Sequence, residues 1–379
     1  MKKIYWRPQS TPLFAFVFIA VLAVGGLTSV EHFQIVKKKP YYMEKVEASK
    51  LTLEAMELVK EERLDRGIPI DPQADPTGSG LIGSFVTSVT SEAADLEAKQ
   101  TSVNPNFAAV VVELLKEAGV KEGDPAAVSF SGSFPALNIA ACAAMATLHL
   151  KPIIISSASS SQWGANYPDF LWIDMEHFLN SKGIFPFHSV AASMGGKHDR
   201  AAELTEKGRD QILQAINRNG LTLIKPSTTI HEDIDRRMAA YFSKVRPKVY
   251  LNIGGGRAAA GVRSFKRLLK PGLLFSDLPV GRRTDSVIRR FLKEGIPVIH
   301  LGELNELARQ YRLPISPATM PQIGEGSVYY QKNYNLWLTG ATLLAIILGL
   351  YLFSRSDWGF RMLQASPHKT DTGPPEPMI

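Results

Sequence analysis

The chain has a single cysteine among its 379 residues, so no intrachain disulfide can form. Cys142 lies in the run AACAAMA, where a thiol is most simply a small buried apolar group. The H-E-x-x-H motif and zinc-cluster spacings are absent, and neither a metal nor another cofactor is expected. Zinc-finger, RNP and basic-zipper patterns are also absent, so nucleic acid is not an expected partner. The net charge of +7 therefore points to another anion: a carboxylate polymer, a phosphate or a membrane surface.

Charged residues are missing from two long apolar runs, at residues 12–30 and 336–353. Each run is long enough to cross the hydrocarbon core of a bilayer. The first run could be a cleaved signal peptide, but the second run favours an uncleaved anchor. We therefore expect a two-pass protein of the cell membrane, in contact with the lipid bilayer. Lys and Arg beyond the outer ends of the two spans favour an extracytoplasmic main domain, whereas Lys37, Lys38, Lys39 and Lys45 favour the opposite orientation. The expected arrangement is an extracytoplasmic domain, with the short segment 1–11 and a disordered, proline-rich tail at 354–379 on the other side.

The region between the two runs divides into a linker and a domain. Residues 43–66 have a helical pattern and precede a Pro/Gly-rich loop, so 31–75 is expected to be a membrane-proximal helix and linker. Strand-like and helix-like segments alternate from 107 to 312, and 81–92 is also strand-like. The predicted fold is α/β, with a mostly parallel, Rossmann-like layered sheet domain at 76–325 between two transmembrane helices.

Three loops that directly follow predicted strands are candidate binding sites, because ligands of open α/β sheets bind at the carboxyl ends of strands. The loops are rich in serine and glycine, which offer hydroxyl and amide donors to an anion. Each also has a structural interpretation: a helix cap, a tight strand-to-helix turn, or a tryptophan that covers the core. The predicted ligand-binding residues in these loops are Ser129, Ser131, Gly132, Ser133, Ser161, Gln162, Trp163, Asn166, Gly254, Gly255, Gly256 and Arg257.

Basic residues are concentrated between Lys248 and Lys293, a stretch that contains eleven Lys and Arg but only two acidic residues. Such an excess favours an anionic partner or lipid headgroups over a merely solvated surface. Arg282 and Arg283 are the candidate ligand-binding residues of this basic run.

Serine catalysis is a second interpretation of the first loop, with Ser131 or Ser133 as the nucleophile. The sequence around Ser131 is S-F-S-G-S, which lacks the flanking glycines of the G-x-S-x-G nucleophile elbow. A base would still be required within hydrogen-bond reach of the hydroxyl. The histidines that could supply it are His149, His177, His188, His198, His231 and His300.

Four stretches resemble the membrane-anchored family named poly-γ-glutamate system protein. They are SFSGSFPALNIAA at 129–141, IIISSASSSQWGANYPDFLWIDME at 153–176, LNIGGG at 251–256 and DPTGSGLIG near 76–83. The resemblance implies an accessory role in synthesis or export of poly-γ-glutamate, alongside other membrane subunits of that system. It brings no assigned catalytic residues. The chain lacks the ATP-binding loop expected of the polymerising ligase and the metal motifs expected of a metallophosphatase-like partner.

The leading hypothesis is therefore a membrane-anchored protein that binds poly-γ-glutamate or a γ-glutamyl precursor through the three loops and the basic run. A serine-dependent amide hydrolase or transferase acting on the γ-glutamyl polymer is the first alternative. A non-catalytic scaffold for the synthase complex is the second. Whether the protein is an enzyme stays open at this point.

Overall fold

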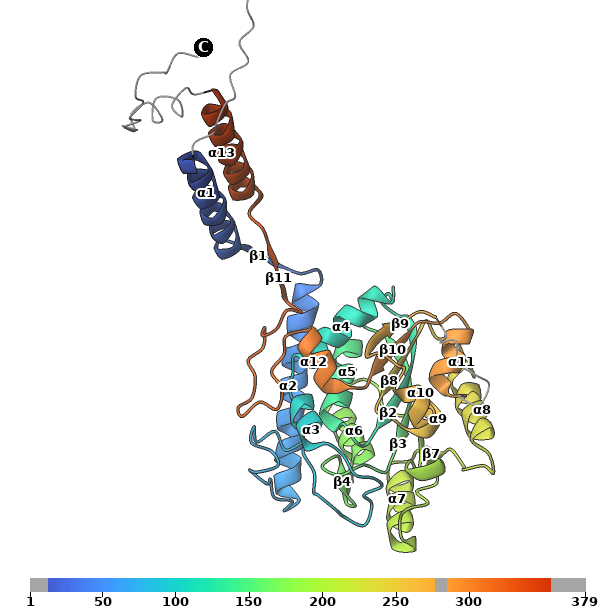
Figure 1. Ribbon diagram of the computed structural model, residues 1–379. Coiled ribbons are helices and arrows are strands. Elements are labelled where there is room, and N and C mark those ends of the chain that lie inside the picture. The colour runs from blue at the N-terminus through green and yellow to red at the C-terminus, as the bar shows by residue number, and fades with distance from the viewer. Residues whose placement is uncertain (1–12, 277–284, 356–379) are drawn as a thin grey trace, which may run out of the picture. The chain divides into compact units, whose positions relative to one another are not determined.

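The computed structural model describes residues 13–276 and 285–355, which separate into two compact units. One unit combines the described ends of the chain, up to Lys37 and from Gln331 onward. The other unit spans Lys38–Tyr330 and contains the central sheet. Figure 1 shows the helices and strands of both units.

The unit formed by the chain ends consists of two helices and a two-stranded sheet: α1 (Leu13–His32), β1 (Ile35–Lys38), β11 (Tyr330–Asn333) and α13 (Leu336–Arg355). Both helices are long and apolar enough to cross a membrane, judged by length and composition. Gly26 of α1 lies against Thr342, and Gly349 of α13 lies against Ile19. The later residue of α1 contacts the earlier residue of α13, and the earlier residue of α1 contacts the later one, so α1 and α13 pack antiparallel.

The second unit is built on a seven-stranded sheet with the order β7-β6-β3-β2-β8-β10-β9. Its strands are β2 (Pro125–Ser131), β3 (Lys151–Ser157), β6 (Ala191–Ser193), β7 (Thr222–Leu223), β8 (Val249–Ile253), β9 (Gly272–Leu274) and β10 (Val298–Leu301). All neighbouring strands pair in parallel except β9, which runs antiparallel to β10 at the edge. A separate hairpin joins β4 (Asn166–Tyr167) to β5 (Phe170–Leu171). The expected mixed α/β fold with a mostly parallel sheet is confirmed.

Both faces of this sheet are covered by helices. Adjacent residues of β2 enter different hydrophobic cores, Val128 on one face and Ala127 on the other, as the period of a strand requires. The first face is covered by α3 (Leu96–Ser102), α4 (Phe107–Glu117), α5 (Pro135–Thr147), α6 (Trp172–Ser181), α7 (Glu206–Arg218) and α12 (Leu304–Gln310). The second face is covered by α8 (Ile230–Tyr241), α9 (Arg257–Ala260), α10 (Arg263–Lys266) and α11 (Val287–Lys293).

The helix α2 (Tyr42–Asp65) forms an outer layer on the first face, next to α4 and α5 (Figure 1). All the alanines of α5 except Ala146 are buried, and their small side chains let α2 approach closely. Ala48, Ala55 and Val59 of α2 are fully buried in return. The segment expected to be a membrane-proximal connector is therefore part of the domain, which begins well before residue 76.

The strand expected at residues 81–92 is absent, and this segment is a loop. Its anchor is Arg63, whose buried guanidinium donates to three carbonyls, those of Pro69 (2.6 Å), Gly80 (2.7 Å) and Ile82 (2.6 Å). Alternation of small and apolar residues predicted a strand here, but the backbone donors and acceptors are satisfied by side chains and by other loops instead.

We predict that Arg63→Met lowers the free energy of unfolding by about 3 kcal/mol, because the buried carbonyls of Gly80 and Ile82 lose a charged donor and the bond to the Pro69 carbonyl is also lost. The control is Arg66→Met, which removes contacts at the surface only, a pair with Glu62, a bond to the Asp169 carbonyl and a contact with the Phe170 ring, and should cost clearly less, about 1 kcal/mol. Denaturant unfolding of the full chain in detergent measures both values. Equal losses in the two variants would contradict this role for Arg63.

Candidate functional site

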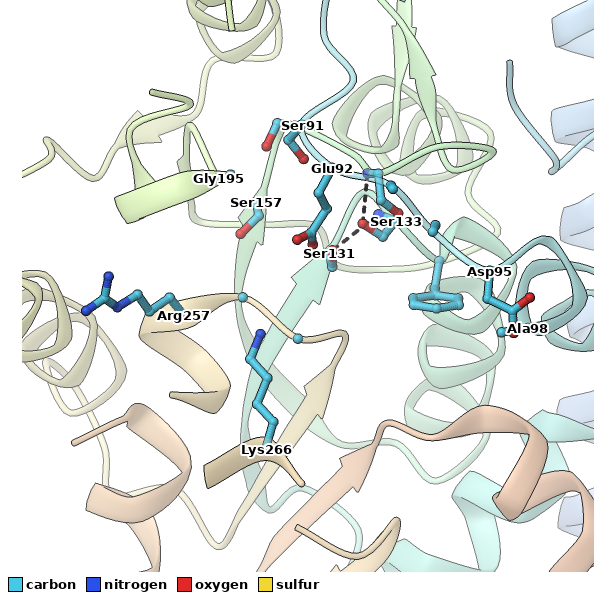
Figure 2. Close-up of a pocket in the computed structure, with 18 of the residues that line it drawn as sticks. Ser91, Glu92, Asp95, Ala98, Ser131, Ser133, Ser157, Gly195, Arg257 and Lys266 are labelled. Atoms are coloured by element: carbon cyan, nitrogen blue, oxygen red, sulfur yellow. Dashed lines mark hydrogen bonds between the residues drawn. The ribbon is translucent and has the colours of Figure 1, made fainter. Parts of the chain in front are cut away.

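A cleft of about 610 Å³ lies at the carboxyl ends of β2, β3, β6, β8 and β10 (Figure 2). The chain builds β2, β3, β6 and β7 outward in one direction and then returns to place β8 on the other side of β2. The helix after β2 covers the first face of the sheet, and the helix after β8 covers the second. The two loops therefore diverge, which opens a crevice at the point where the strand order reverses.

Close backbone contacts explain the glycines in these loops. A side chain at Gly132 would meet the carbonyl oxygen of Ser159 at 2.9 Å, so only glycine lets the first two loops touch. Gly254 has a φ of +88°, and a Cβ there would lie 2.7 Å from the Cβ of Ser131. These two positions bring the loops after β2, β3 and β8 into one surface.

Serine hydroxyls form the floor of the cleft, and their donor hydrogens are not used within the described residues. The Oγ atoms of Ser131, Ser133 and Ser161 each accept a bond, from Ser133 N (3.2 Å), Ser161 N (3.1 Å) and Lys99 Nζ (2.8 Å). Each hydroxyl therefore keeps its hydrogen for another acceptor. Ser159 is 3% exposed, and its Oγ has no hydrogen-bond partner. Buried polar groups of this kind are normally satisfied, so the floor is suited to an acceptor-rich ligand.

Lys99 brings a buried ammonium to the same floor. Only 2% of the residue is exposed, and its Nζ donates to the Ser133 carbonyl and to Ser161 Oγ. The Nζ also lies 4.0 Å from the centre of the Phe134 ring. Among the residues that the structure describes, no carboxylate forms an ion pair with it. Burial lowers the pKa of Lys99 to about 7, and the charge of Glu92 opposes that shift.

Lys266 provides a second cation from the opposite side of the cleft (Figure 2). The residue is half-buried, its ammonium group forms no hydrogen bond or ion pair with the described residues, and burial lowers its pKa. Its Nζ lies over Gly255, 3.2 Å from where a Cβ would stand. The N–H groups of Gly255 and Gly256 are exposed and donate to no acceptor in the described chain. Such successive amide donors are an anion-binding arrangement.

Glu92 projects into the cleft from the loop that crosses above the strand ends (Figure 2). Its backbone is held on both sides: Ser91 N donates to Ser160 O (2.8 Å), and Gln162 N donates to Glu92 O (3.0 Å). Ala94 N donates to Gln162 Oε1 (3.2 Å). The Glu92 carboxylate forms no ion pair with any described residue. Glu92, Lys99 and Lys266 therefore line one cleft and form no ion pair with one another.

Three of the four other acids that line the cleft pair with another group or cap a helix. Asp199 pairs with the buried Arg237 at 2.6 Å and accepts from Ser193 Oγ. Glu203 accepts from the backbone N of Lys197, and Asp95 caps α3. The Asp95 carboxylate points away from the serine floor (Figure 2). Glu303, at the N-terminus of α12, is exposed.

The structure places half of the sequence-predicted loop residues at the cleft. Lining residues are Ser131, Ser133, Ser161, Gly255, Gly256 and Arg257, with the Arg257 side chain directed away from Ser131 at the rim (Figure 2). Gly132 and Gly254 lie behind them and permit the close contacts. Ser129 is buried in β2 and does not line the cleft.

Gln162, Trp163 and Asn166 also do not line the cleft. Gln162 holds the Glu92 loop, and the Trp163 ring packs on Phe85 with 5.2 Å between centroids. The buried Asn166 carboxamide accepts from Ser84 N and donates to Ser84 O and Thr90 Oγ1. These side chains fix the loop of residues 81–94 rather than face a ligand.

The basic run does not form one continuous charged surface in the described residues. Arg290 pairs with Asp285 at 2.6 Å and with Asp235 at 3.3 Å, and Arg289 is buried. Lys266 alone of the run's lysines lines the cleft among the described residues. Arg282 and Arg283 lie outside the described residues.

No described histidine stands beside the cleft serines. His300 lines a smaller pocket of about 150 Å³ next to the cleft, where its Nδ1 lies 3.0 Å from the Asn252 amide nitrogen. Burial lowers the pKa of His300 to about 4. The side chain of His198 lies outside the described parts of the chain. The remaining histidines that the sequence offered as bases, His149, His177, His188 and His231, do not line the cleft.

Sequence reasoning missed Glu92 and Lys99 and gave Lys266 no special role. Glu92 and Lys99 occur in SEAADLEAKQ, whose charges are typical of a solvated helix surface. Only the tertiary contacts of the loop turn them inward. In the described ranges, no cluster of three or more His, Cys, Asp or Glu side chains could hold a metal ion. No family model, curated protein or solved structure matches this chain.

We predict that the stability difference between Lys99→Met and the wild type depends on pH. Because burial lowers the folded-state pKa to about 7, charging Lys99 opposes folding below pH 7, and this penalty is relieved as pH rises from about 7 to about 10. The stability advantage of the methionine variant should fall over that range, by up to about 1.4 kcal/mol per pH unit. Denaturant unfolding at several pH values measures it. A pH-independent difference would contradict a buried ammonium.

Proposed function

We propose that the protein is a membrane-anchored accessory protein of poly-γ-glutamate synthesis or export, and that its Rossmann-like domain binds the polymer or a γ-glutamyl precursor in the strand-end cleft. The observation that carries this proposal is the surplus of donors at the cleft floor. Three serine hydroxyls keep their hydrogens, one buried hydroxyl has no partner, and two ammoniums lack a carboxylate contact. The resemblance of the loop sequences to the poly-γ-glutamate system family supplies the process.

A carboxylate is the acceptor that best fits this surplus. Each repeat of poly-γ-glutamate carries one free carboxylate, which can accept several bonds at its two oxygens. Hydrogen bonds to an ionised acceptor contribute about 1.5–3 kcal/mol each, roughly twice a neutral bond. Lys99 and Lys266 approach from different elements, so a carboxylate between them would be held from two directions.

The apolar helices α1 and α13 support the membrane part of the proposal. As two spans they would place the α/β domain on one side of the membrane, and the Lys/Arg balance of the sequence favours the extracytoplasmic side. The antiparallel helix pair would also be the surface available to other membrane subunits of the system. The Gly26–Thr342 contact is of the small-residue kind that lets membrane helices approach closely.

We predict that Lys266→Met weakens binding of γ-glutamyl oligomers at least tenfold, because the cleft loses a cation without a protein partner. Lys270→Met is the matched control: this lysine is exposed, follows α10 and does not line the cleft, so affinity should change less than twofold. Calorimetric titration of the full chain in detergent measures both, and raising the salt concentration should weaken wild-type binding. Undetectable binding in the wild type would instead favour the scaffold function.

A serine-dependent acyl transfer is the second candidate, favoured by one contact. Ser161 Oγ lies 2.8 Å from Lys99 Nζ, and a pKa of about 7 leaves a large fraction of that amine neutral at neutral pH. A neutral Lys99 could take the Ser161 proton as the oxygen attacks a γ-glutamyl carbonyl, and could return it to the departing amine. Water would then hydrolyse the acyl-serine. A Ser161–Lys99 pair is proposed here instead of a pair of Ser131 or Ser133 with a histidine base, because no described histidine lines the cleft.

For this candidate we predict that the purified chain shortens poly-γ-glutamate and that Ser161→Ala abolishes the shortening. Ser131→Ala, which changes another floor hydroxyl without touching the Lys99 contact, should retain more than a tenth of the rate. Size-exclusion chromatography of the polymer over time measures the reaction. Shortening that persists in Ser161→Ala, or none in the wild type, rules out this pair as the catalyst.

A further inference from the structure

The cleft carries charges of both signs, whereas a site for a simple polyanion would carry one. The acid in question is Glu92, whose carboxylate points at Ser131 from above, while the Lys266 amine points into the same space from the other side (Figure 2). Glu92 is also the charge that acts on the pKa values of both Lys99 and Lys266. It nevertheless forms no ion pair with either among the described residues.

This separation is maintained by the backbone. The Glu92 loop is fixed by hydrogen bonds to Ser160 and Gln162, and Lys99 is tied to Ser133 and Ser161. An acid beside a free lysine on a mobile surface could simply close into a salt bridge. Here Glu92 and the lysines line one cleft without an ion pair, and the buried Ser159 hydroxyl of the same cleft has no partner among the described residues. A ligand that offers both a cation and an anion would satisfy both sides.

We propose that the cleft recognises an α-amino acid group, with its ammonium on Glu92 and its carboxylate on Lys266, Lys99 and the serine hydroxyls. In a γ-linked glutamate chain, every α-amine except the first is acylated. The inference rests on the proposed function and deepens it: the cleft binds the amino-terminal residue of the polymer, or free glutamate, in preference to interior repeats. Glu92 is then the residue that determines this specificity.

The test compares the γ-glutamyl-glutamate dipeptide with its N-acetylated form by calorimetric titration of the full chain in detergent. The wild type is expected to bind the free dipeptide at least tenfold more tightly, because acetylation removes the ammonium that faces Glu92. Glu92→Gln should abolish this preference, with weaker binding of the free dipeptide and equal or tighter binding of the acetylated one. Binding of the acetylated dipeptide should not weaken, because the glutamine amide, unlike the Glu92 carboxylate, does not repel the ligand carboxylates.

Asp95→Asn is the matched control, since it also converts an acid lining the cleft to its amide. Asp95 points away from the floor, and asparagine preserves the helix cap, so the preference for the free amine should remain. Glu92 is exposed, so its substitution is not expected to impair folding. A preference that survives in Glu92→Gln, or is lost equally in Asp95→Asn, would overturn the assignment to Glu92.

The outcomes separate this inference from the proposed function. If the wild type binds free and acetylated dipeptides equally, recognition of the amine is wrong, while polymer binding stands. If free glutamate and the free dipeptide bind with the Glu92-dependent preference but the polymer does not bind, the amino acid site stands and the proposed function falls. If none of these ligands binds, both are overturned.

Discussion

The parallel pairing of β2 with β8 is the constraint on which the cleft depends. The chain first adds strands on one side of β2 and then returns to place β8 on the other, so two adjacent strands are followed by loops that lead to opposite faces of the sheet. The φ of +88° at Gly254 lets the two loops touch at Ser131 before they separate. The serine floor and the glycine amides owe their common location to this single reversal.

The buried charges at the cleft differ in whether the fold gives them a partner of opposite charge. Arg237 and Asp199 are both buried and form a 2.6 Å ion pair at the cleft. Each of these two buried charges therefore has a partner of opposite charge within the fold. Lys99 is buried to the same degree but contacts only a carbonyl, a hydroxyl and an aromatic ring. The fold carries the desolvation cost of that ammonium without a carboxylate, a cost that an anionic ligand would offset.

The parts of the structure that local patterns determine were predictable from the sequence. The apolar helices, the strand–loop–helix units around Ser131 and Gly254, and the mostly parallel sheet all follow from periodicity and glycine placement. The loop at 81–92 was not predictable, because Arg63 and Asn166 hold it through contacts with distant segments. For the same reason, Glu92 resembled a solvated surface charge, and Trp163 and Asn166 resembled ligand-binding residues although they pack against this loop.

The loop after β3 therefore acts on the site in two ways. Ser161 contributes a hydroxyl to the floor directly, whereas Gln162, the next residue, acts through the loop that carries Glu92. Because Gln162 bonds backbone groups on both sides of Ala93, it fixes where the acid stands without changing the floor. The position of the acid and the chemistry of the floor are thus set by neighbouring residues with separate roles.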